Sequence, residues 1–399
     1  MKNNVKLSLA NYKMLDHADV LENKSKYKKK STKIIIQQLN KKQWTSGPYK
    51  KENWGNRLHS VAPYIGRIKP SFAHWLIKTC TKPGDVVFDP FCGIGTVPLE
   101  ADLLGRKAIG FDLNDYAIII AKAKFERRSL ENNLKWLNKI ELNGKDVTIK
   151  SIPKYVRQFY HPKTLREIII VRDQMIKSHR NFLLGCLIGI VHGHRPQYLS
   201  AWTGYIIPFT PNSKPEYRPV LERMLAKTKR MYETGFPSKT NAIIAKKDAR
   251  TKCLPNNSVD VVISSPPYFD TIDYVTSNRL RLSMLGMSDE KKINLKRKLI
   301  QKQKSYLEEM LKVGKILKDV LKNESLCIFV LGDVHKPNYS INTANEISKL
   351  YSDLGFKKLA IIEDEIPLAR RTTNKWKGNK ILGKTKRKLD RILVMELHK

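Results

Sequence analysis

The chain has 399 residues, of which 75 are Lys or Arg and 37 are Asp or Glu, so its formal net charge is +38. A hydrophobic fraction of 41% is enough to build a substantial core, which excludes a chain that is disordered throughout. The positive charge indicates a polyanionic partner, because each phosphate that a basic side chain neutralises releases condensed counterions. A general enrichment in lysine explains part of this excess, but not its uneven distribution along the chain.

The five cysteines are scattered, and no two of them form a Cys-x-x-Cys pair. The sequence therefore predicts neither a disulfide framework nor a metal site. The first 14 residues lack the apolar core of a signal peptide, and the longest apolar run, residues 182–191, is too short to span a bilayer. We therefore expect a soluble protein of the cytoplasm.

Residues 1–52 form a basic N-terminal segment that is rich in lysine and weakly patterned. It is either a solvated tail or an arm that contacts nucleic acid, and the isoleucines at 34–36 begin a short strand or a helix. Regular structure is clearer within residues 53–124. There, an apolar strand at 86–88 leads into a glycine-rich turn, a helical pattern that Gly105 ends, and a second strand at 108–111. This order opens a doubly wound α/β sheet.

Residues 125–240 interrupt the alternation of strands and helices. They contain the apolar helical stretch 182–191 and then a segment rich in proline and aromatic residues, and we interpret them as an insertion that carries substrate contacts. The alternation resumes in residues 241–399 with a buried strand at 258–263. We expect a long charged helix at about 289–322, a strand at 326–331, and two late strands around 359–366 and 391–397.

The string Asp89-Pro-Phe-Cys-Gly93-Ile-Gly95-Thr96 lies at the carboxyl end of the first strand, where open α/β sheets bind ligands. Gly93 and Gly95 allow a tight turn and a close approach to a ligand. Asp112 ends the next strand 19 residues after Gly93, near the spacing at which an acid meets ribose hydroxyls. An acid at position 89 suits a cationic sulfonium or ammonium group better than a pyrophosphate. The turn therefore favours S-adenosylmethionine over a dinucleotide.

A second informative string, Ser265-Pro266-Pro267-Tyr268, follows the buried strand at 258–263. Two consecutive prolines remove two backbone donors and stiffen the segment, so that its carbonyls point outward. Methylation of an aromatic amine needs a rigid acceptor for the amino protons, which the Pro266 carbonyl and the Ser265 hydroxyl provide, while Tyr268 stacks on a base that has left the duplex. A structural Pro-Pro turn explains these four residues alone, but not their combination with the glycine string.

Both strings resemble motifs of the DNA amino-methyltransferases: the cofactor motif Asp-Pro-Phe-x-Gly-x-Gly-Thr and the catalytic motif (Asp/Asn/Ser)-Pro-Pro-(Tyr/Phe/Trp). Residues 57–72, 110–114 and 273–282 are similar to further blocks of that family, and the resemblance covers residues 57–125 and 245–397. It implies a Rossmann-like S-adenosylmethionine-dependent methyltransferase sheet with helices on both faces, plus an inserted target-recognition region. The implied catalytic residues are Ser265, Pro266, Pro267 and Tyr268, and the implied cofactor-binding residues are Asp89, Pro90, Phe91, Gly93, Gly95, Thr96, Asp112, Asp248 and Tyr64.

Within this set, the resemblance assigns the ribose hydroxyls to Asp112, the methionine portion to Asp89 and Gly93, and the adenine amino group to Asp248. The resemblance implies a site-specific DNA methyltransferase of the restriction-modification type. A serine at the first position of the catalytic motif is more frequent in enzymes that methylate cytosine N4, so Ser265 favours that base. The substrate would be double-stranded DNA with a flipped target base, and a cognate restriction endonuclease would be a further partner. The alternatives are adenine N6, an RNA guanine N2-methyltransferase, and a nucleic-acid binder that has lost catalysis. Cytosine C5 methylation is excluded, because it needs a cysteine directly after a proline.

A basic loop at residues 368–388 contains nine basic residues and no acidic residue. Arg370, Arg371, Lys375 and Lys377 lie in it, and Trp376 interrupts the charges. So many like charges would repel one another without an anion, which predicts contacts to the DNA backbone rather than a solvated hairpin. Arg195, in the insertion, is a candidate reader of bases.

Overall fold

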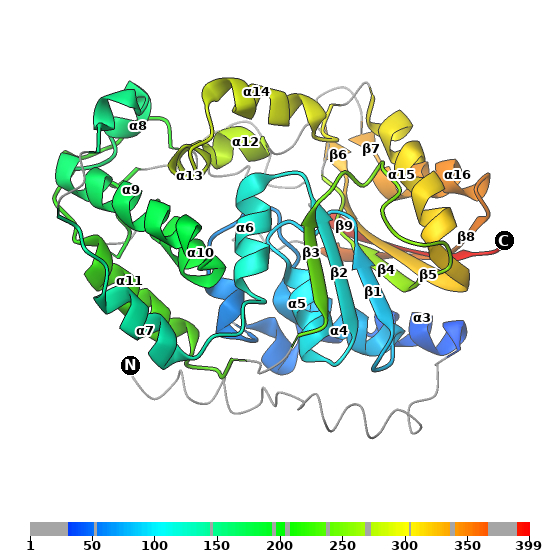
Figure 1. Ribbon diagram of the computed structural model, residues 1–399. Helices are drawn as coiled ribbons and strands as arrows, with labels where there is room; N and C mark the ends of the chain where they lie inside the picture. The colour runs from blue at the N-terminus through cyan, green and yellow to red at the C-terminus, as the bar shows by residue number, and fades with distance from the viewer. Residues whose placement is uncertain are drawn as a thin grey trace.

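The structure is a computed structural model that describes residues 31–51, 54–143, 147–193, 197–203, 208–236, 240–267, 273–302, 305–335, 340–365 and 389–399. In this part of the chain, seven strands form one sheet in the order β3-β2-β1-β4-β5-β9-β8 (Figure 1). The first five run parallel, and β9 is antiparallel to both of its neighbours. The strands are β1 (Val86–Asp89), β2 (Lys107–Asp112), β3 (Ala242–Lys246), β4 (Val259–Ser264), β5 (Leu321–Gly332), β8 (Phe356–Glu365) and β9 (Leu389–Leu397).

Successive residues of the central strands pack on opposite faces of the sheet, as the period of two in a strand requires. Val87 and Ile263 face one core with helices α3 (Thr32–Asn40), α4 (Pro70–Cys80) and α5 (Thr96–Leu103). Phe88 and Val262 face the other core with α15 (Tyr306–Val320) and α16 (Thr343–Ser352). The prediction of a Rossmann-like sheet with helices on both faces is confirmed.

The insertion packs against helix α6 (Asp115–Ala123) through a third hydrophobic core. Its helices are α7 (Leu130–Asn138), α8 (Lys154–Arg157), α9 (Pro162–Lys177), α10 (Asn181–Ile190) and α11 (Val220–Met231), to the left of α6 in Figure 1. Helix α10 lies so close that a Cβ at Gly185 would come within 2.4 Å of the Ala123 Cβ, and one at Gly189 within 2.1 Å of the Val61 carbonyl oxygen. Residues 181–190 therefore share a core with the segment around Val61 and with α6. The domain boundaries remain predictions.

The single charged helix that we expected at 289–322 is wrong. The structure has two helices, α14 (Asp289–Lys298) and α15, and strand β5 already begins at Leu321. Only α15 carries an apolar face with helical spacing, at Tyr306, Met310, Val313 and Leu317. Leu299, directly after α14, has an extended backbone, and Ile300 is buried under the sheet. The apolar pair therefore leaves the helix in order to enter the core.

The remaining elements follow the sequence pattern closely. The isoleucines at 34–36 lie in helix α3, so the helical alternative was correct. Gly105 follows the last turn of α5 with a φ of +76°, a conformation that suits glycine. The late strands begin earlier than expected, at Phe356 and Leu389. Two further short strands, β6 (Val334–His335) and β7 (Ser340–Ile341), pair with each other outside the main sheet.

Candidate active site

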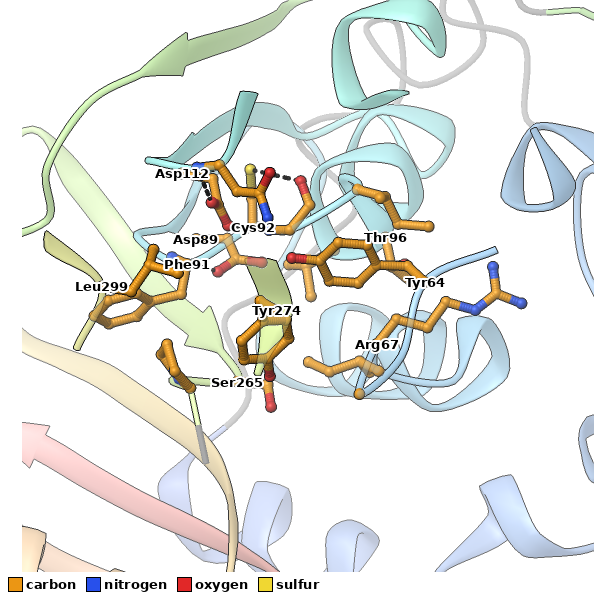
Figure 2. Close-up of a pocket in the computed structure, with 17 residues that line it drawn as sticks. Tyr64, Arg67, Asp89, Phe91, Cys92, Thr96, Asp112, Ser265, Tyr274 and Leu299 are labelled. Carbon is orange, nitrogen blue, oxygen red and sulfur yellow. Dashed lines mark hydrogen bonds between the residues drawn. The ribbon is translucent and has the colours of Figure 1, made fainter. Parts of the chain in front are cut away.

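A pocket with about 620 Å³ of empty space, part of it open to solvent, lies at the carboxyl ends of β1, β2 and β4 (Figure 2). This is the edge at which open α/β sheets bind ligands. Residues of the string 89–96 after β1, Asp112 at the end of β2, and Ser265 and Pro267 after β4 all line it. Its lining consists of Tyr64, Gly66, Arg67, Ile68, Asp89, Phe91, Cys92, Gly93, Ile94, Thr96, Val97, Asp112, Asn114, Ser265, Pro267, Tyr274 and Leu299.

The structure places most of the predicted residues at this pocket. Those that line it are Tyr64, Asp89, Phe91, Gly93, Thr96, Asp112, Ser265 and Pro267. Pro90, Gly95 and Pro266 lie in the same strings without lining it, and Asp248 lies beyond the end of β3. Tyr268, Arg195, Arg370, Arg371, Lys375 and Lys377 lie outside the described residues. The roles assigned to all of these residues remain predictions.

Close packing and one hydrogen bond fix the conformation of the turn that contains Gly93 and Gly95. Gly93 has a φ of +51°, and a Cβ there would lie 3.4 Å from Cε1 of Tyr64. Gly95, with a φ of +74°, caps the start of α5, and its Cβ would lie 3.0 Å from the Ala121 Cβ. The Gly93 amide donates a 2.9 Å hydrogen bond to Oδ2 of Asp112. The acid that ends β2 thus fixes the turn that follows β1.

Asp89 is almost fully buried at the floor of the pocket, and its Oδ1 accepts hydrogen bonds from Ser264 Oγ at 2.6 Å and from the Phe91 amide at 3.1 Å. Burial raises the pKa of Asp89 to about 7, because these hydrogen bonds compensate only in part for lost hydration. Burial likewise raises the pKa of Asp112 to about 6. A bound cation would offset the cost of ionising these buried carboxyls, as a sulfonium or ammonium group does.

Two buried polar atoms at the pocket have no hydrogen-bond partner among the described residues: the Thr96 hydroxyl and Nδ2 of Asn114. Buried polar groups are normally paired, so each indicates a partner that a ligand supplies. S-adenosylmethionine offers carboxylate, hydroxyl and ring-nitrogen acceptors for them and positive charge for Asp89. The residues of the pocket therefore fit this cofactor.

An aromatic stack closes one side of the pocket. The rings of Tyr64 and Tyr274 lie 5.8 Å apart at 24° to each other, and Tyr116 packs behind Tyr64 at 5.9 Å. Tyr274 begins the short helix α12 (Tyr274–Ser277), just beyond the catalytic string. Because Tyr64 comes from the segment before β1, this stack joins the two predicted halves of the site.

A buried carboxylate anchors the segment that carries Tyr64. The two oxygens of Glu100, on α5, lie 2.6 Å from Nε2 of His59 and 2.8 Å from Nδ1 of His74. Burial alone would raise the pKa of Glu100, but the two histidines outweigh burial and lower it to about 2. Burial lowers the pKa of His59 as well, although the hydrogen bond to Glu100 opposes this effect. Glu100 thereby fixes residues 57–80 against the helix that follows the glycine turn.

The catalytic string presents an acceptor to the pocket. Ser265 Oγ donates a 3.1 Å hydrogen bond to the Val330 carbonyl on the neighbouring strand β5. Since its single proton is used there, the oxygen faces other partners as an acceptor.

Asp248 behaves differently from the other predicted cofactor residues. Both of its oxygens accept hydrogen bonds from Arg250, in a bidentate pair with distances of 2.8 and 2.6 Å. Burial alone would raise the pKa of Asp248, but these hydrogen bonds outweigh burial and lower it.

Several lining residues were not assigned a role from the sequence: Arg67, Ile68, Cys92, Ile94, Asn114, Tyr274 and Leu299. Cys92, Asn114 and Tyr274 lie in or beside recognisable motifs, and that position was the available signal. Arg67 lies within the block 57–72 and Leu299 within the helix expected at 289–322, but nothing in either segment marked these two residues as pocket residues.

The described residues hold no group of three or more His, Cys, Asp or Glu side chains that is suited to a metal ion. All five cysteines are free thiols. In the same part of the chain, no helix combines the length and the apolar character that crossing a membrane requires.

Residues 2–123 match the DNA methylase family of N6 and N4 methyltransferases. M.BsoBI, a Type II methyltransferase of Geobacillus stearothermophilus, is 27% identical over 320 residues, which cover 66% of this chain and 59% of that protein. A tRNA (guanine(10)-N2)-dimethyltransferase of Methanocaldococcus jannaschii is 30% identical over 131 residues, which cover 30% of this chain and 37% of that protein. The chain thus spans less than two thirds of the length of either relative.

A Thermus thermophilus protein solved in complex with S-adenosyl-L-methionine is 18% identical to this chain. The alignment covers 38% of this chain and 51% of that one, with a TM-score of 0.24. The sequence match over residues 2–123 includes the glycine turn and both acids of the pocket, and it supports S-adenosylmethionine as the cofactor. Over residues 2–123 the chain is similar to the N6/N4 DNA methylase family, and the similarity to M.BsoBI covers 66% of the chain.

Proposed function

We propose that the protein transfers a methyl group from S-adenosylmethionine to an exocyclic amino nitrogen of a base in DNA, with cytosine N4 as the favoured target. The main support is the pocket itself, which brings Asp89, Gly93 and Asp112 together with Ser265 and Pro267. Cofactor residues and acceptor residues thus share one cavity, as a transfer between two bound molecules requires.

In this proposal, the cofactor supplies an electrophilic methyl group on a sulfonium. The residues of the chain hold and orient the amino group. Ser265 Oγ, whose proton is bonded to the Val330 carbonyl, accepts from one amino N–H, and the Pro266 carbonyl accepts from another. These hydrogen bonds favour a pyramidal nitrogen with its lone pair directed at the methyl group. The N–C bond would form as the S–C bond breaks, which leaves S-adenosylhomocysteine, and the nitrogen would release one proton to solvent. No covalent bond between the enzyme and the base is needed, so no cysteine nucleophile takes part.

The choice of cytosine N4 rests on Ser265. Adenine N6 is the alternative, since the same acceptors serve either amino group. Duplex DNA requires that the target base be flipped out of the helix, because its amino group is otherwise paired. The similarity to M.BsoBI supports a Type II restriction-modification role with a cognate endonuclease as partner. Such a role implies a reaction in the cytoplasm.

A second candidate is methylation of guanine N2 in tRNA, which the similarity to the Methanocaldococcus jannaschii enzyme supports over 131 residues. One experiment separates the candidates. The purified chain is incubated with methyl-labelled S-adenosylmethionine and either unmethylated DNA or unmodified tRNA, and the nucleosides are then identified by mass spectrometry. Asp89→Ala serves as the control without cofactor binding.

We expect label in N4-methylcytosine. Label in N6-methyladenine would show that the target base is adenine instead of cytosine and would leave the proposed mechanism unchanged. Label in 5-methylcytosine, or transfer to tRNA alone, would overturn the proposal.

A further inference from the structure

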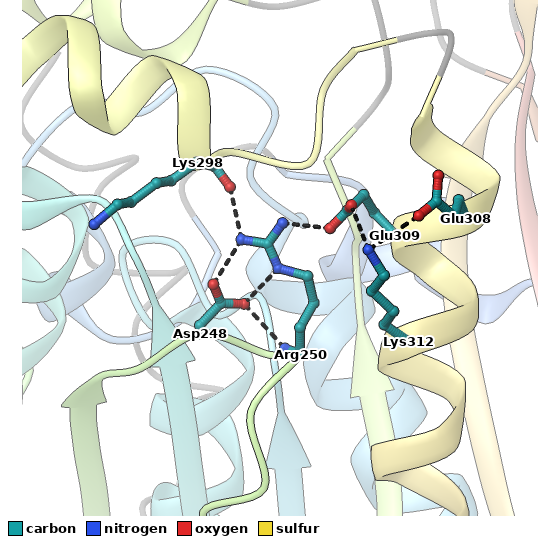
Figure 3. Close-up of polar contacts among 6 residues, drawn as sticks. All are labelled: Asp248, Arg250, Lys298, Glu308, Glu309 and Lys312. Carbon is teal, nitrogen blue, oxygen red and sulfur yellow. Dashed lines mark hydrogen bonds and ion pairs between the residues drawn. The ribbon is translucent and has the colours of Figure 1, made fainter.

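Arg250 lies at the centre of a polar cluster that includes Asp248, Lys298 and Glu309 (Figure 3). Its Nε and Nη2 donate to the two oxygens of Asp248 at 2.8 and 2.6 Å. Nη2 also donates to the Lys298 carbonyl at 2.9 Å, and Nη1 donates to Glu309. One guanidinium thereby joins the turn after β3, the end of α14 and the first turn of α15.

Two of these partners connect directly to the pocket. Lys298 is the last residue of α14, and the next residue, Leu299, lines the pocket. Asp248 follows β3, whose Lys246 pairs with Asp112 on β2, and the amide of Lys247 donates to the Asp112 carbonyl at 3.2 Å. Asp248 therefore lies two residues beyond the strand partner of the acid that is predicted to hold the ribose.

The bonds to Arg250 leave Asp248 with acceptor capacity. Its Oδ1 accepts from the Arg250 amide at 3.0 Å and from Nε, whereas Oδ2 accepts only from Nη2 within the described chain. A carboxylate oxygen has two lone pairs, so one acceptor site on Oδ2 is open to a ligand donor. The fork of the guanidinium sets the plane of the carboxylate and hence the direction of that site.

We propose that Arg250 is a positioning residue for the cofactor: it orients Asp248 toward the adenine amino group and holds Leu299 at the edge of the pocket. The inference rests on S-adenosylmethionine as the cofactor and on the predicted role of Asp248, but not on which base is methylated. Lysine would keep the charge without the planar fork, so it would not reproduce the four hydrogen bonds of the guanidinium or their fixed geometry.

The test compares binding of S-adenosylhomocysteine with binding of S-inosylhomocysteine, in which an oxo group replaces the adenine amino group. Isothermal titration without DNA gives both affinities, so the result is independent of the methylation product. In the native chain we expect a preference for the adenosyl compound of about tenfold or more, because the inosyl oxygen would face the carboxylate. The ratio of two affinities measured on one sample does not depend on how much of a variant is folded.

Asp248→Asn, Arg250→Gln and Arg250→Lys are each expected to reduce this preference to about twofold or less. Arg391→Gln is the matched control, because Arg391 also bonds both oxygens of an acid, Asp333, at 2.9 Å, and contacts a second acid, Glu363, away from the pocket lining. It should keep the native preference. A full preference in Asp248→Asn or in either Arg250 variant would overturn the proposal, as would an equal loss in Arg391→Gln.

Discussion

The hydroxyl of Ser264 donates a 2.6 Å hydrogen bond to Oδ1 of Asp89, and both residues are buried. Asp89 ends β1 and Ser264 ends β4, and these two strands are neighbours in the sheet. Because Ser265 follows Ser264 directly, the bond links the residue before the predicted catalytic motif to Asp89, which is predicted to bind the cofactor. A change that breaks the bond between Ser264 and Asp89 is therefore expected to affect both cofactor affinity and turnover.

Cofactor affinity should rise with pH. Burial raises the pKa of Asp89 to about 7 and that of Asp112 to about 6, so part of the cofactor-free protein is protonated at pH 6. A cationic ligand binds the ionised form, and binding then releases protons. We expect the affinity for S-adenosylmethionine to increase by about tenfold between pH 6 and pH 8. Calorimetry in buffers of different ionisation enthalpy measures the released protons, and a flat profile would contradict the assigned role of Asp89.

The same burial predicts how the stability of the cofactor-free protein depends on pH. The pKa of Asp89 is higher in the folded state than its usual value of 3.8, so the folded state binds the proton more tightly. Its contribution to stability is present below about pH 4 and is lost as the pH rises toward 7. Asp89→Asn keeps an oxygen acceptor for Ser264 and the Phe91 amide but has no charge to desolvate. Its melting temperature should therefore exceed that of the native chain at pH 8, with a smaller difference at pH 5.5, even though cofactor binding is lost.

The elements that sequence patterns predicted well are those whose pattern has a single physical cause. The central strands, such as Val86–Asp89 and Val259–Ser264, are parallel and mostly buried on both faces, so their sequences are short, mainly apolar runs, with Asp260 as the interior exception. The charged stretch 289–322 was harder to predict, because its residues favour a helix even where the chain leaves helix α14 at Leu299. That break depends on Leu299 and Ile300 contacting a pocket and a core that only the folded chain creates.

Sequence patterns also predicted only some of the residues of the candidate site. Asp89, Gly93 and Thr96 are close together in the sequence, and their order before a helix already indicates a ligand turn. Arg67 and Leu299 also line the pocket, but the family block 57–72 and the expected helix 289–322 that contain them gave neither residue a role. The hydrogen bonds between Arg250 and Asp248 were also not predicted. The family resemblance assigned Asp248 a contact with the cofactor, but it gave no protein partner for the carboxylate.

Ser265→Ala should lower turnover more than cofactor binding. The variant removes the oxygen that is proposed to accept an amino proton but leaves the acids and the glycine turn unchanged. We expect a fall in kcat of about 100-fold, at the lower end of what a side chain positioned to accept a proton contributes, with little change in the Kd of S-adenosylmethionine. Ser258→Ala is the control, because Ser258 precedes the same strand and its hydroxyl bonds only the Pro255 carbonyl within the described chain. Equal losses in both variants would indicate damage to β4 rather than a role in transfer.

Tyr274 should contribute to cofactor binding through its ring. It stacks on Tyr64 at 5.8 Å and lines the pocket, although sequence patterns assigned it no role beyond its place in a family block. Tyr274→Leu removes a stacking face, which is worth about 0.5–1.5 kcal/mol beyond burial, so the Kd of S-adenosylmethionine should rise by about two- to tenfold. Tyr274→Phe keeps the ring and should bind within about twofold of the native chain. Tyr217→Leu, at an exposed tyrosine outside the pocket lining, controls for the general loss of an aromatic side chain. If Tyr274→Phe lost as much affinity as Tyr274→Leu, the hydroxyl rather than the stack would carry the contact.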